Sequence, residues 1–526
     1  MYLVKIAEVW PSANGQFVPR KAAASGGGDR STFCATIPPP PPRLGPCMQN
    51  FAWKTWHLVG IGGIGVSGVA RLLKAKGLEV QGSDVRESQI TLALRDEGIA
   101  VHIGHAASNL AGAEVVVLST AIPETNPEIV AARAAGIPVL HRSEALGWLV
   151  GETRSVGVIG THGKGTVSGA SAWLLQQAGW TPGFVIGGLL LNWGINAQPG
   201  RPLVAPSAHA GERWLVAEVD ESDGSLVNSH PVVALLNNLE LDHLHYYPEW
   251  PKLEAAVLQY FQGNPRLETA VINSDDPGCQ KILAKLSLPS AQLVTFGFEG
   301  MPTVRGVDLR TERMGGRFAI EVQEQGGYRR LGEVEIRLPG KYNASNLLGA
   351  AALAWSQGVP FAVIAKALPE YKGLENRFTL MDAAGVEVVK DYISHPTGIQ
   401  RVLEAARAQA QGPVIAVFKP YRFTMIHYLM ADYQKAFRDA DRVVVTELYT
   451  AGEVPIAGTD VHVLCDNIRQ VTPDVTYVHA LDAIAPWLLA EVAAPATVLF
   501  FGGDDLFRTA DGYAKERIAL YGGATP

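Results

Sequence analysis

A glycine-rich loop that contains one lysine is the part of this sequence that most directly indicates a chemistry. An apolar run of strand type, residues 156–159, leads into the loop, and a helical stretch follows it. Backbone amides in such a loop bind the β- and γ-phosphates of a nucleotide, and the lysine ammonium neutralises charge that builds up during phosphoryl transfer. The predicted ATP-binding residues are Gly160, Thr161, His162, Gly163, Lys164, Gly165 and Thr166. A loop that only closes a strand–helix turn is the structural alternative.

Acidic residues directly follow two later segments of strand type, residues 214–217 and 235–241. The first run is followed by Glu218, Asp220, Glu221 and Asp223, and the second by Asp242 and His243. Such clusters are costly unless cations neutralise them, and carboxylate oxygens are ligands that Mg²⁺ prefers. The sequence therefore predicts bound magnesium near the phosphate loop, and a solvated acidic loop is the alternative.

A second glycine motif lies closer to the N-terminus. Residues 57–65 read as a strand that enters a G-x-G-x-x-G turn at Gly60, Gly62 and Gly65, and a later strand reaches Asp84. The glycines let a backbone approach a diphosphate at a helix N-terminus, and Asp84 is spaced to contact a ribose. The motif does not distinguish NAD from another diphosphate-containing ligand, and it also fits a purely structural turn.

Strands that alternate with helices must position these motifs. The alternation runs from residue 56 to the C-terminus and predicts βαβ units with parallel sheets. Three such sets predict three α/β domains, at residues 51–150, 151–376 and 377–526. Residues 1–50 include five consecutive prolines, so we expect a disordered tail, or a start of translation at Met48.

Bulk composition limits the possible partners. The chain has 526 residues, of which 47% are hydrophobic and 18% charged, so it can fill several cores. A net charge of -7 gives no general attraction to nucleic acid. No apolar run approaches the length of a membrane span, and the four cysteines lack metal-ligand spacing. We expect a cytoplasmic protein with no nucleic-acid or membrane partner.

Many motifs in this order resemble the Mur ligases of peptidoglycan synthesis, over residues 53–526. The resemblance rests on residues 60–65, 160–164, 217–223, 242–243, 340–343 with 346, 376–378, 391–392 with 395–397, 420 with 422–424, and 449–453. It implies a Rossmann-like UDP-binding domain, a central P-loop ATPase-like domain with a parallel-rich sheet, and a C-terminal Rossmann-like α/β domain that binds an amino acid.

The resemblance is strongest to the members that join L-alanine to UDP-N-acetylmuramate. It implies ATP and Mg²⁺ as cosubstrate and cofactor, an acyl phosphate intermediate, and a monomer or weak homodimer. By this resemblance, Lys164 would contact the phosphates, Asn343 would lie near adenine, and Glu218 and His243 would serve magnesium. The remaining implied residues are Ser222 and Asp223 for the UDP substrate, and Arg377, His395 and Arg422 for catalysis.

Six positions depart from the family pattern: Gly165 in the phosphate loop, and Ile393, Ser394, Lys419, Tyr421 and Met425 in the third domain. Gly165 replaces a hydroxyl residue that ligates magnesium, and Thr166 is the expected substitute. Ser394 and Tyr421 replace histidines, and Met425 replaces a basic residue, which makes the amino-acid site less cationic. These changes leave open a ligase for another amino acid or a peptide, and a non-catalytic nucleotide-binding homologue. An NAD-dependent oxidoreductase would explain only Gly60 to Gly65 and Asp84.

Overall fold

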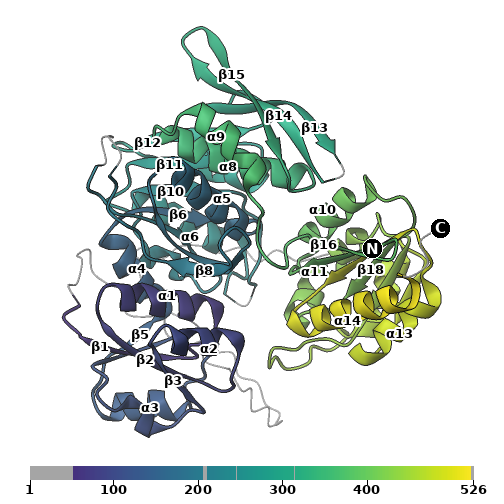
Figure 1. Cartoon of the computed structure of the whole chain (residues 1–526), viewed down its shortest axis with the longest axis horizontal. Coiled ribbons are helices and arrows are strands. Elements are labelled where there is room, and N and C mark those ends of the chain that lie inside the picture. The colour runs from purple at the N-terminus through teal and green to yellow at the C-terminus, as the bar shows by residue number, and fades with distance from the viewer. Residues whose placement is uncertain (1–50, 205–209, 245, 313, 523–526) are drawn as a thin grey trace, which may run out of the picture. The chain divides into compact units, whose positions relative to one another are not determined.

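Three β-sheets organise the described part of the chain (Figure 1). The computed structural model describes residues 51–204, 210–244, 246–312 and 314–522. Each sheet is predominantly or wholly parallel and is covered by helices, so the predicted organisation into three α/β domains is confirmed.

The predicted disordered tail at residues 1–50 and the alternative start at Met48 lie outside the described residues. Among the described residues, no helix is long and apolar enough to cross a bilayer.

The first sheet is wholly parallel, with strand order β3-β2-β1-β4-β5. Its strands are β1 (Thr55–Val59), β2 (Glu79–Asp84), β3 (Ala100–Ile103), β4 (Val115–Leu118) and β5 (Val139–His141). The helices are α1 (Ile64–Ala75), α2 (Gln89–Asp96), α3 (Pro127–Ala134) and α4 (Arg142–Gly151). The order reverses between β1 and β4, and such a switch point is where open α/β sheets bind ligands. The first glycine motif follows β1 and lies at this point.

A buried carboxylate links the strands of this domain to α3. The side chain of Glu128 is fully buried and accepts hydrogen bonds from Ser83 Oγ (2.5 Å) and Asn109 Nδ2 (2.7 Å). Its Oε2 also lies 3.3 Å from His57 Nε2. Burial would raise the pKa of Glu128, but these partners outweigh it and lower the pKa to about 2. The carboxylate is therefore ionised in the folded protein at neutral pH.

The central sheet has ten strands in the order β15-β14-β13-β12-β11-β10-β6-β9-β7-β8. They are β6 (Arg154–Ile159), β7 (Gly183–Leu190), β8 (Ile195–Gln198), β9 (Trp214–Glu218), β10 (Val233–Leu236), β11 (Thr269–Asn273), β12 (Gln292–Gly297), β13 (Val304–Glu312), β14 (Gly315–Glu324) and β15 (Gly327–Ile336). The helices are α5 (Lys164–Gln177), α6 (Trp250–Gln262), α7 (Pro277–Leu283), α8 (Lys341–Ser356) and α9 (Phe361–Ala367). Strand β6 pairs in parallel with β9 on one side and β10 on the other. The phosphate loop and both acidic segments therefore leave the same edge of the sheet.

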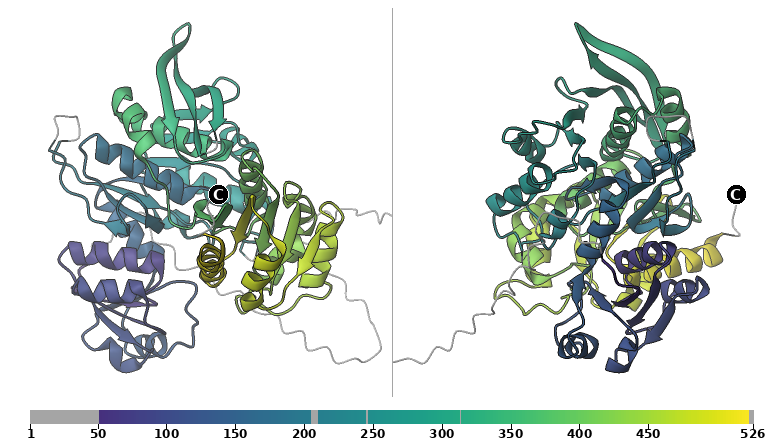
Figure 2. Two further views of the ribbon diagram at one scale, coloured as in Figure 1. Left: turned by 45° about the vertical axis from the view of Figure 1, so that its right-hand side comes forward. Right: turned by 90° about the vertical axis from the view of Figure 1, so that its left-hand side faces the viewer.

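An antiparallel extension of the central sheet was not predicted from the sequence. Strands β13, β14 and β15 pair antiparallel, and Figure 2 shows these long strands projecting at one edge of the domain. The β14–β15 turn is made by Gln325 and Gly326, and Gly326 has a positive φ of 92°. The β7–β8 pair is also antiparallel, at the opposite edge. The central sheet is thus parallel only in its middle, which is the part that carries the predicted site.

The first and central domains share one hydrophobic cluster. It includes Val66 and Val69 of α1, Val185 of β7 and Ala197 of β8. A polar bridge reinforces the contact: Arg71 Nη1 donates to Asn196 Oδ1 at 2.6 Å, and Asn196 Nδ2 donates to the Ile64 carbonyl at 2.6 Å. The first helix of the N-terminal domain is therefore fixed on the edge of the central sheet.

The third sheet has the order β16-β17-β21-β18-β19-β20, and only the β16–β17 pair is antiparallel. Its strands are β16 (Thr379–Ala383), β17 (Val386–Asp391), β18 (Val414–Phe418), β19 (Arg442–Val445), β20 (Val475–Tyr477) and β21 (Ala496–Phe501). The helices are α10 (Pro396–Arg407), α11 (Phe423–Ala436), α12 (Val461–Arg469), α13 (Leu481–Glu491) and α14 (Asp504–Tyr521). Helices α10 to α12 share one core cluster with this sheet, and α13 and α14 share another. The two clusters give the doubly covered sheet of a Rossmann-like domain.

We predict that Glu128→Gln lowers the free energy of unfolding at pH 7 by about 3 kcal/mol, because a buried network loses its only anion. The pKa of Glu128 is lower in the folded chain, so its contribution is fully present above pH 4.5. It is lost as the pH falls towards 2. Calorimetric unfolding of both proteins at pH 7 and pH 4 measures the difference. Glu124→Gln, at an exposed ion pair with Arg133, is the control, and an equal effect there would contradict the prediction.

Candidate active site

The phosphate loop joins β6 to α5 in a conformation that requires glycine. Gly160 and Gly163 have φ angles of 142° and 75°. A Cβ atom on Gly163 would lie 2.6 Å from Asn346 Oδ1, and one on Gly160 would lie 3.0 Å from the Asn238 carbonyl oxygen. Larger residues at either position would strain the backbone and collide with neighbours. The backbone amides of the loop therefore lie at one edge of the sheet, at the N-terminus of α5.

Two asparagines behind β10 hold the loop. The Asn238 Oδ1 atom accepts the amide of His162 at 2.7 Å. The carbonyl of His162 accepts Asn237 Nδ2 at 3.0 Å and Asn238 Nδ2 at 2.8 Å. The Thr161 hydroxyl donates to the carbonyl of Glu240 at 3.1 Å. The β10 segment therefore fixes the loop backbone before any nucleotide binds.

A chain of side-chain amides connects the loop to Asn343. Asn237 Nδ2 donates to Asn346 Oδ1 at 2.7 Å, and Asn346 Nδ2 donates to Asn343 Oδ1 at 3.3 Å. Asn343 in turn donates to the carbonyl of Pro339 at 2.8 Å. All three asparagines are buried. The structure thus places the predicted adenine residue at the start of α8, next to the phosphate loop.

Lys164 lies in a partly buried, strongly acidic environment. Its Nζ donates to Glu221 Oε1 at 2.8 Å and to the carbonyl of Gly160 at 2.7 Å. Burial alone would lower the pKa of Lys164, but Glu221, Asp220 and Glu218 outweigh it and raise the pKa. The ammonium is therefore charged. From the sequence, Glu221 was one carboxylate among four without a specific role, and the structure identifies it as the partner of the lysine.

The predicted magnesium residues lie around the same lysine. His243 Nε2 is 3.7 Å from Glu221 Oε1, and Glu218 Oε2 accepts the amide of Gly187 at 2.7 Å. Burial would lower the pKa of His243, but Glu221 and Asp242 raise it. Glu221 Oε2 is buried and lacks a hydrogen-bond partner among the described residues. The carboxylate oxygens and the imidazole together form a donor set that fits a divalent metal ion. An ion that binds His243 must displace the proton from its ring.

The position that faces Glu218 is 165, where the chain has no side chain. A Cβ atom on Gly165 would lie 3.3 Å from Glu218 Oε2 and 3.0 Å from Leu374 Cδ2. Thr166 is buried, and its carbonyl accepts the hydroxyl of Tyr371 at 3.1 Å. Within the described residues, no hydrogen bond joins the Thr166 hydroxyl to Glu218 or His243. The role of Thr166 as a metal ligand therefore stays a prediction.

In the first domain, the glycine turn is closed by Asp84. The amide of Gly62 donates to Asp84 Oδ2 at 2.9 Å, and a Cβ atom on Gly62 would lie 2.8 Å from the same oxygen. Gly60 adopts a φ of 72°. Gly65 packs against Arg142, since its Cβ would lie 2.8 Å from Arg142 Nη1. The turn has the expected geometry, and the contact between Asp84 and a ribose stays a prediction.

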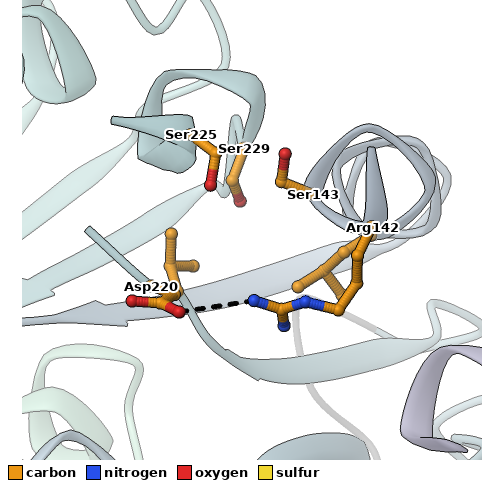
Figure 3. A pocket seen from close by; sticks show the side chains of 7 residues that line it. Arg142, Ser143, Asp220, Ser225 and Ser229 are labelled. Carbon is orange, nitrogen blue, oxygen red and sulfur yellow. Dashed lines mark hydrogen bonds and ion pairs between the residues drawn. The ribbon is translucent and has the colours of Figure 1, made fainter. Parts of the chain in front are cut away.

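Arg142 and His141 join this turn to the acidic segment of the central domain. Arg142 Nη2 donates to Asp220 Oδ2 at 3.4 Å (Figure 3), and His141 Nε2 lies 3.3 Å from Asp223 Oδ2. The amide of Ser222 donates to Asp220 Oδ1 at 3.0 Å. A small pocket beside them is lined by Arg142, Ser143, Asp220, Ser225 and Ser229. The structure therefore brings the predicted substrate residues Gly65, Ser222 and Asp223 to one region.

Sequence reasoning assigned no role to His141 or Arg142. They stand where β5 ends and α4 begins, which is the carboxyl edge of the first sheet. That placement was a usable signal, because the carboxyl edge is where parallel sheets bind ligands.

Of the predicted C-terminal residues, His395 reaches the central domain. It lies at the start of α10, with Nδ1 3.5 Å from Glu240 Oε1. In the described chain, the side-chain hydrogen bonds and ion pairs of Arg377 and Arg422 are to residues of their own domain. Arg377 Nη1 lies 3.6 Å from Asp391 Oδ1, and Arg422 Nη1 donates to Glu453 Oε1 at 3.2 Å. The two arginines are thus not joined to Lys164 in this arrangement.

Two of the unusual residues of this chain contact each other. The Ser394 hydroxyl donates to Met425 Sδ at 3.9 Å, and the ring of Tyr421 stacks on Tyr449 with centroids 5.6 Å apart. Lys419 pairs with Asp505 at 2.6 Å and lies 3.4 Å from Glu447. Its charge is therefore paired with carboxylates of its own domain.

Family models match the chain along most of its length. The model described as "Mur ligase family, catalytic domain" matches residues 55–154. "Mur ligase middle domain" matches residues 158–354, and "Mur ligase, glutamate ligase domain" matches residues 376–503.

Individual proteins show the same likeness. A UDP-N-acetylmuramate–L-alanine ligase from Rhizorhabdus wittichii is 37% identical over 468 residues, covering 88% of this chain and 96% of that protein. The solved UDP-N-acetylmuramate-alanine ligase from Thermotoga maritima has a TM-score of 0.71 at 24% identity, covering 89% of this chain and 99% of that one, which supports the fold. A UDP-N-acetylmuramate:L-alanyl-gamma-D-glutamyl-meso-diaminopimelate ligase from Neisseria meningitidis has a TM-score of 0.55 at 28% identity, covering 62% of this chain and all of that one.

We predict that Gly165→Ser lowers the Mg²⁺ concentration for half-maximal phosphate release by about threefold to tenfold, because a hydroxyl is added beside Glu218. Gly165→Ala is the matched control, since it adds the same Cβ without an oxygen. Magnesium titrations of steady-state phosphate release measure the effect. An identical response in the serine and alanine variants would show that position 165 does not reach the metal.

Proposed function

This chain belongs to the Mur ligase family, and we propose that it is an ADP-forming ligase that joins L-alanine to the carboxylate of UDP-N-acetylmuramate. The proposal rests on one observation above all: Lys164, Glu221, Glu218 and His243 gather beside a glycine phosphate loop at the ends of three adjacent strands. Eight curated relatives named as UDP-N-acetylmuramate–L-alanine ligases are 34–39% identical over 77–89% of the chain and support the choice of substrates.

In the first step, the substrate carboxylate attacks the γ-phosphoryl group of ATP. The bond between the γ-phosphorus and the β–γ bridging oxygen breaks, so that an acyl phosphate forms and ADP leaves. Charge then spreads over the equatorial oxygens, where the loop amides and Lys164 stabilise it. Glu221 keeps the lysine protonated and oriented towards the loop. Glu218 and His243 would hold Mg²⁺ there, and the ion, when bound, neutralises further phosphate charge.

In the second step, the alanine amine displaces phosphate through a tetrahedral intermediate. Arg377 and Arg422 would face the acyl phosphate and the amino acid, and this requires the C-terminal domain to move so that both leave their present partners, Asp391 and Glu453. Closure of the domain excludes water, which competes with the amine as nucleophile.

The first domain would bind the UDP group, with Gly60, Gly62 and Gly65 on the diphosphate and Asp84 on the ribose. Arg142 would bind the substrate and orient it towards Ser222 and Asp223, because Arg142 contacts both Gly65 and Asp220. We also propose that the enzyme acts in the cytoplasm as a monomer or weak homodimer.

A ligase that accepts a peptide is the second candidate. The Ser394–Met425 pair makes the amino-acid region less cationic than the family pattern, and the Neisseria meningitidis relative has a peptide in its name.

The decisive experiment supplies the purified protein with ATP, Mg²⁺ and UDP-N-acetylmuramate, and follows inorganic phosphate with L-alanine, other amino acids or the tripeptide. We expect phosphate release that depends on L-alanine, with a ligated product seen by mass spectrometry. Lys164→Met should reduce the rate by at least about 100-fold, because the developing phosphate charge loses its cation.

The alternatives give different results in this assay. Release with the tripeptide alone would exclude L-alanine as the amine, and ATP binding without turnover for any amine would indicate a non-catalytic homologue. Lys285, an exposed lysine of the central domain that pairs with Glu254, provides the control variant Lys285→Met, which should retain the wild-type rate.

We predict that Arg142→Gln raises KM for UDP-N-acetylmuramate by about 10-fold to 100-fold with a smaller change in kcat, because one charged hydrogen bond to a bound substrate is lost. Initial rates at varied UDP-N-acetylmuramate measure the effect. Arg133→Gln, on the exposed surface of α3, is the matched control and should leave KM unchanged. A loss of kcat with an unchanged KM would place Arg142 in the chemical step instead.

A further inference from the structure

Three side chains from two domains converge beside the phosphate loop. His162 belongs to the loop, Glu240 follows β10, and His395 lies at the start of α10 in the C-terminal domain. One ligand atom from each lies within 4.8 Å of the others, and the two imidazole rings have centroids 5.0 Å apart. His162 Nε2 and Glu240 Oε1 are in direct contact. Two imidazoles and a carboxylate are a common set of ligands for transition metals.

The imidazole of His395 makes no hydrogen bond to the described residues. His395 is only 6% exposed, and both of its ring nitrogens are buried. Buried polar atoms in native structures nearly always have a partner. The unsatisfied nitrogen at 3.5 Å from Glu240 Oε1 points to a missing ligand.

We propose that His162, Glu240 and His395 bind a divalent transition-metal ion of the zinc type, which bridges the central and C-terminal domains. Imidazole nitrogen favours zinc over magnesium, which prefers oxygen ligands. The ligands differ from Glu218 and His243, so this site is separate from the proposed magnesium site. Three protein ligands leave one position of a tetrahedral ion open.

The carboxylate of Glu240 is oriented for such a role. Thr397 Oγ1 donates to Glu240 Oε2 at 2.8 Å, which leaves Oε1 facing both histidines. Hydrogen bonds of this kind from surrounding residues commonly orient metal-binding carboxylates. In a tetrahedral site with bonds near 2.1 Å, ligand atoms are about 3.4 Å apart, close to the 3.5 Å between Glu240 Oε1 and His395 Nδ1. Small shifts of His162 would complete the geometry.

Binding of the ion has a consequence for domain movement. Two ligands come from the central domain and one from the C-terminal domain, so the ion stabilises only the arrangement in which all three meet. His162 also lies within the phosphate loop, so the ion and the loop share one residue. The inference concerns metal binding and does not depend on the proposed ligase activity.

The test uses the untagged full-length protein, freed of metal by dialysis against a chelator and without nucleotide. Titration calorimetry with ZnCl₂ should show a site that is weakened at least tenfold in His395→Asn and in His162→Asn. His243→Asn is the matched control, because it removes a histidine of the magnesium site, and it should retain the zinc site. Co²⁺ in place of Zn²⁺ should give visible absorption bands in the wild type that disappear in His395→Asn.

Glu240→Gln keeps the shape of the side chain and serves as a second variant if a histidine variant unfolds, and it should also weaken zinc at least tenfold. Circular dichroism and thermal unfolding establish that each variant is folded. Zinc affinity that is unchanged in folded His395→Asn, or lost only in His243→Asn, would overturn the proposal. The absence of zinc binding to the wild type would overturn it as well.

Discussion

The ion pairing of the partly buried Lys164 ammonium with carboxylates is the interaction on which the rest of this site depends. Burial disfavours the charge, and only Glu221, Asp220 and Glu218 make it stable. Those carboxylates come from the segment after β9, and the lysine comes from the segment after β6. Parallel pairing of the two strands therefore assembles the charges, and a different strand order would leave each of them unpaired.

The asparagines behind β10 complete this arrangement without adding charge. They fix the phosphate loop through its own amide and carbonyl groups, and through Asn346 they tie the loop to α8. The loop is therefore held in shape by neutral hydrogen bonds, while the lysine and the carboxylates beside it remain available to a charged ligand.

The local motifs were predictable because strand, glycine turn and helix follow each other within a few residues. The same reasoning correctly indicated three α/β domains and the resemblance to the Mur ligases. It missed the antiparallel strands β13 to β15, because it relied on the alternation of strands with helices, which indicates only parallel units.

Contacts between residues far apart in sequence were beyond local reasoning. Glu221 could not be chosen from four carboxylates without the position of Lys164. Arg142 meets Asp220 across 78 residues, and Thr397 meets Glu240 across 157. Spacing in the sequence does not encode such distances, which are set by how the sheets pack.

The two domain interfaces of the molecule differ in chemistry, because in the described chain only the first and central domains share a hydrophobic cluster with buried residues from both. Val66 and Val69 are buried against Val185 and Ala197, so separating these two domains would expose apolar surface to water. The C-terminal domain meets the central domain through polar groups at Glu240 and through partly buried side chains such as Leu244 and Tyr342. Polar contacts exchange readily for water. We therefore expect that any opening and closing during turnover moves the C-terminal domain, while the first and central domains stay together.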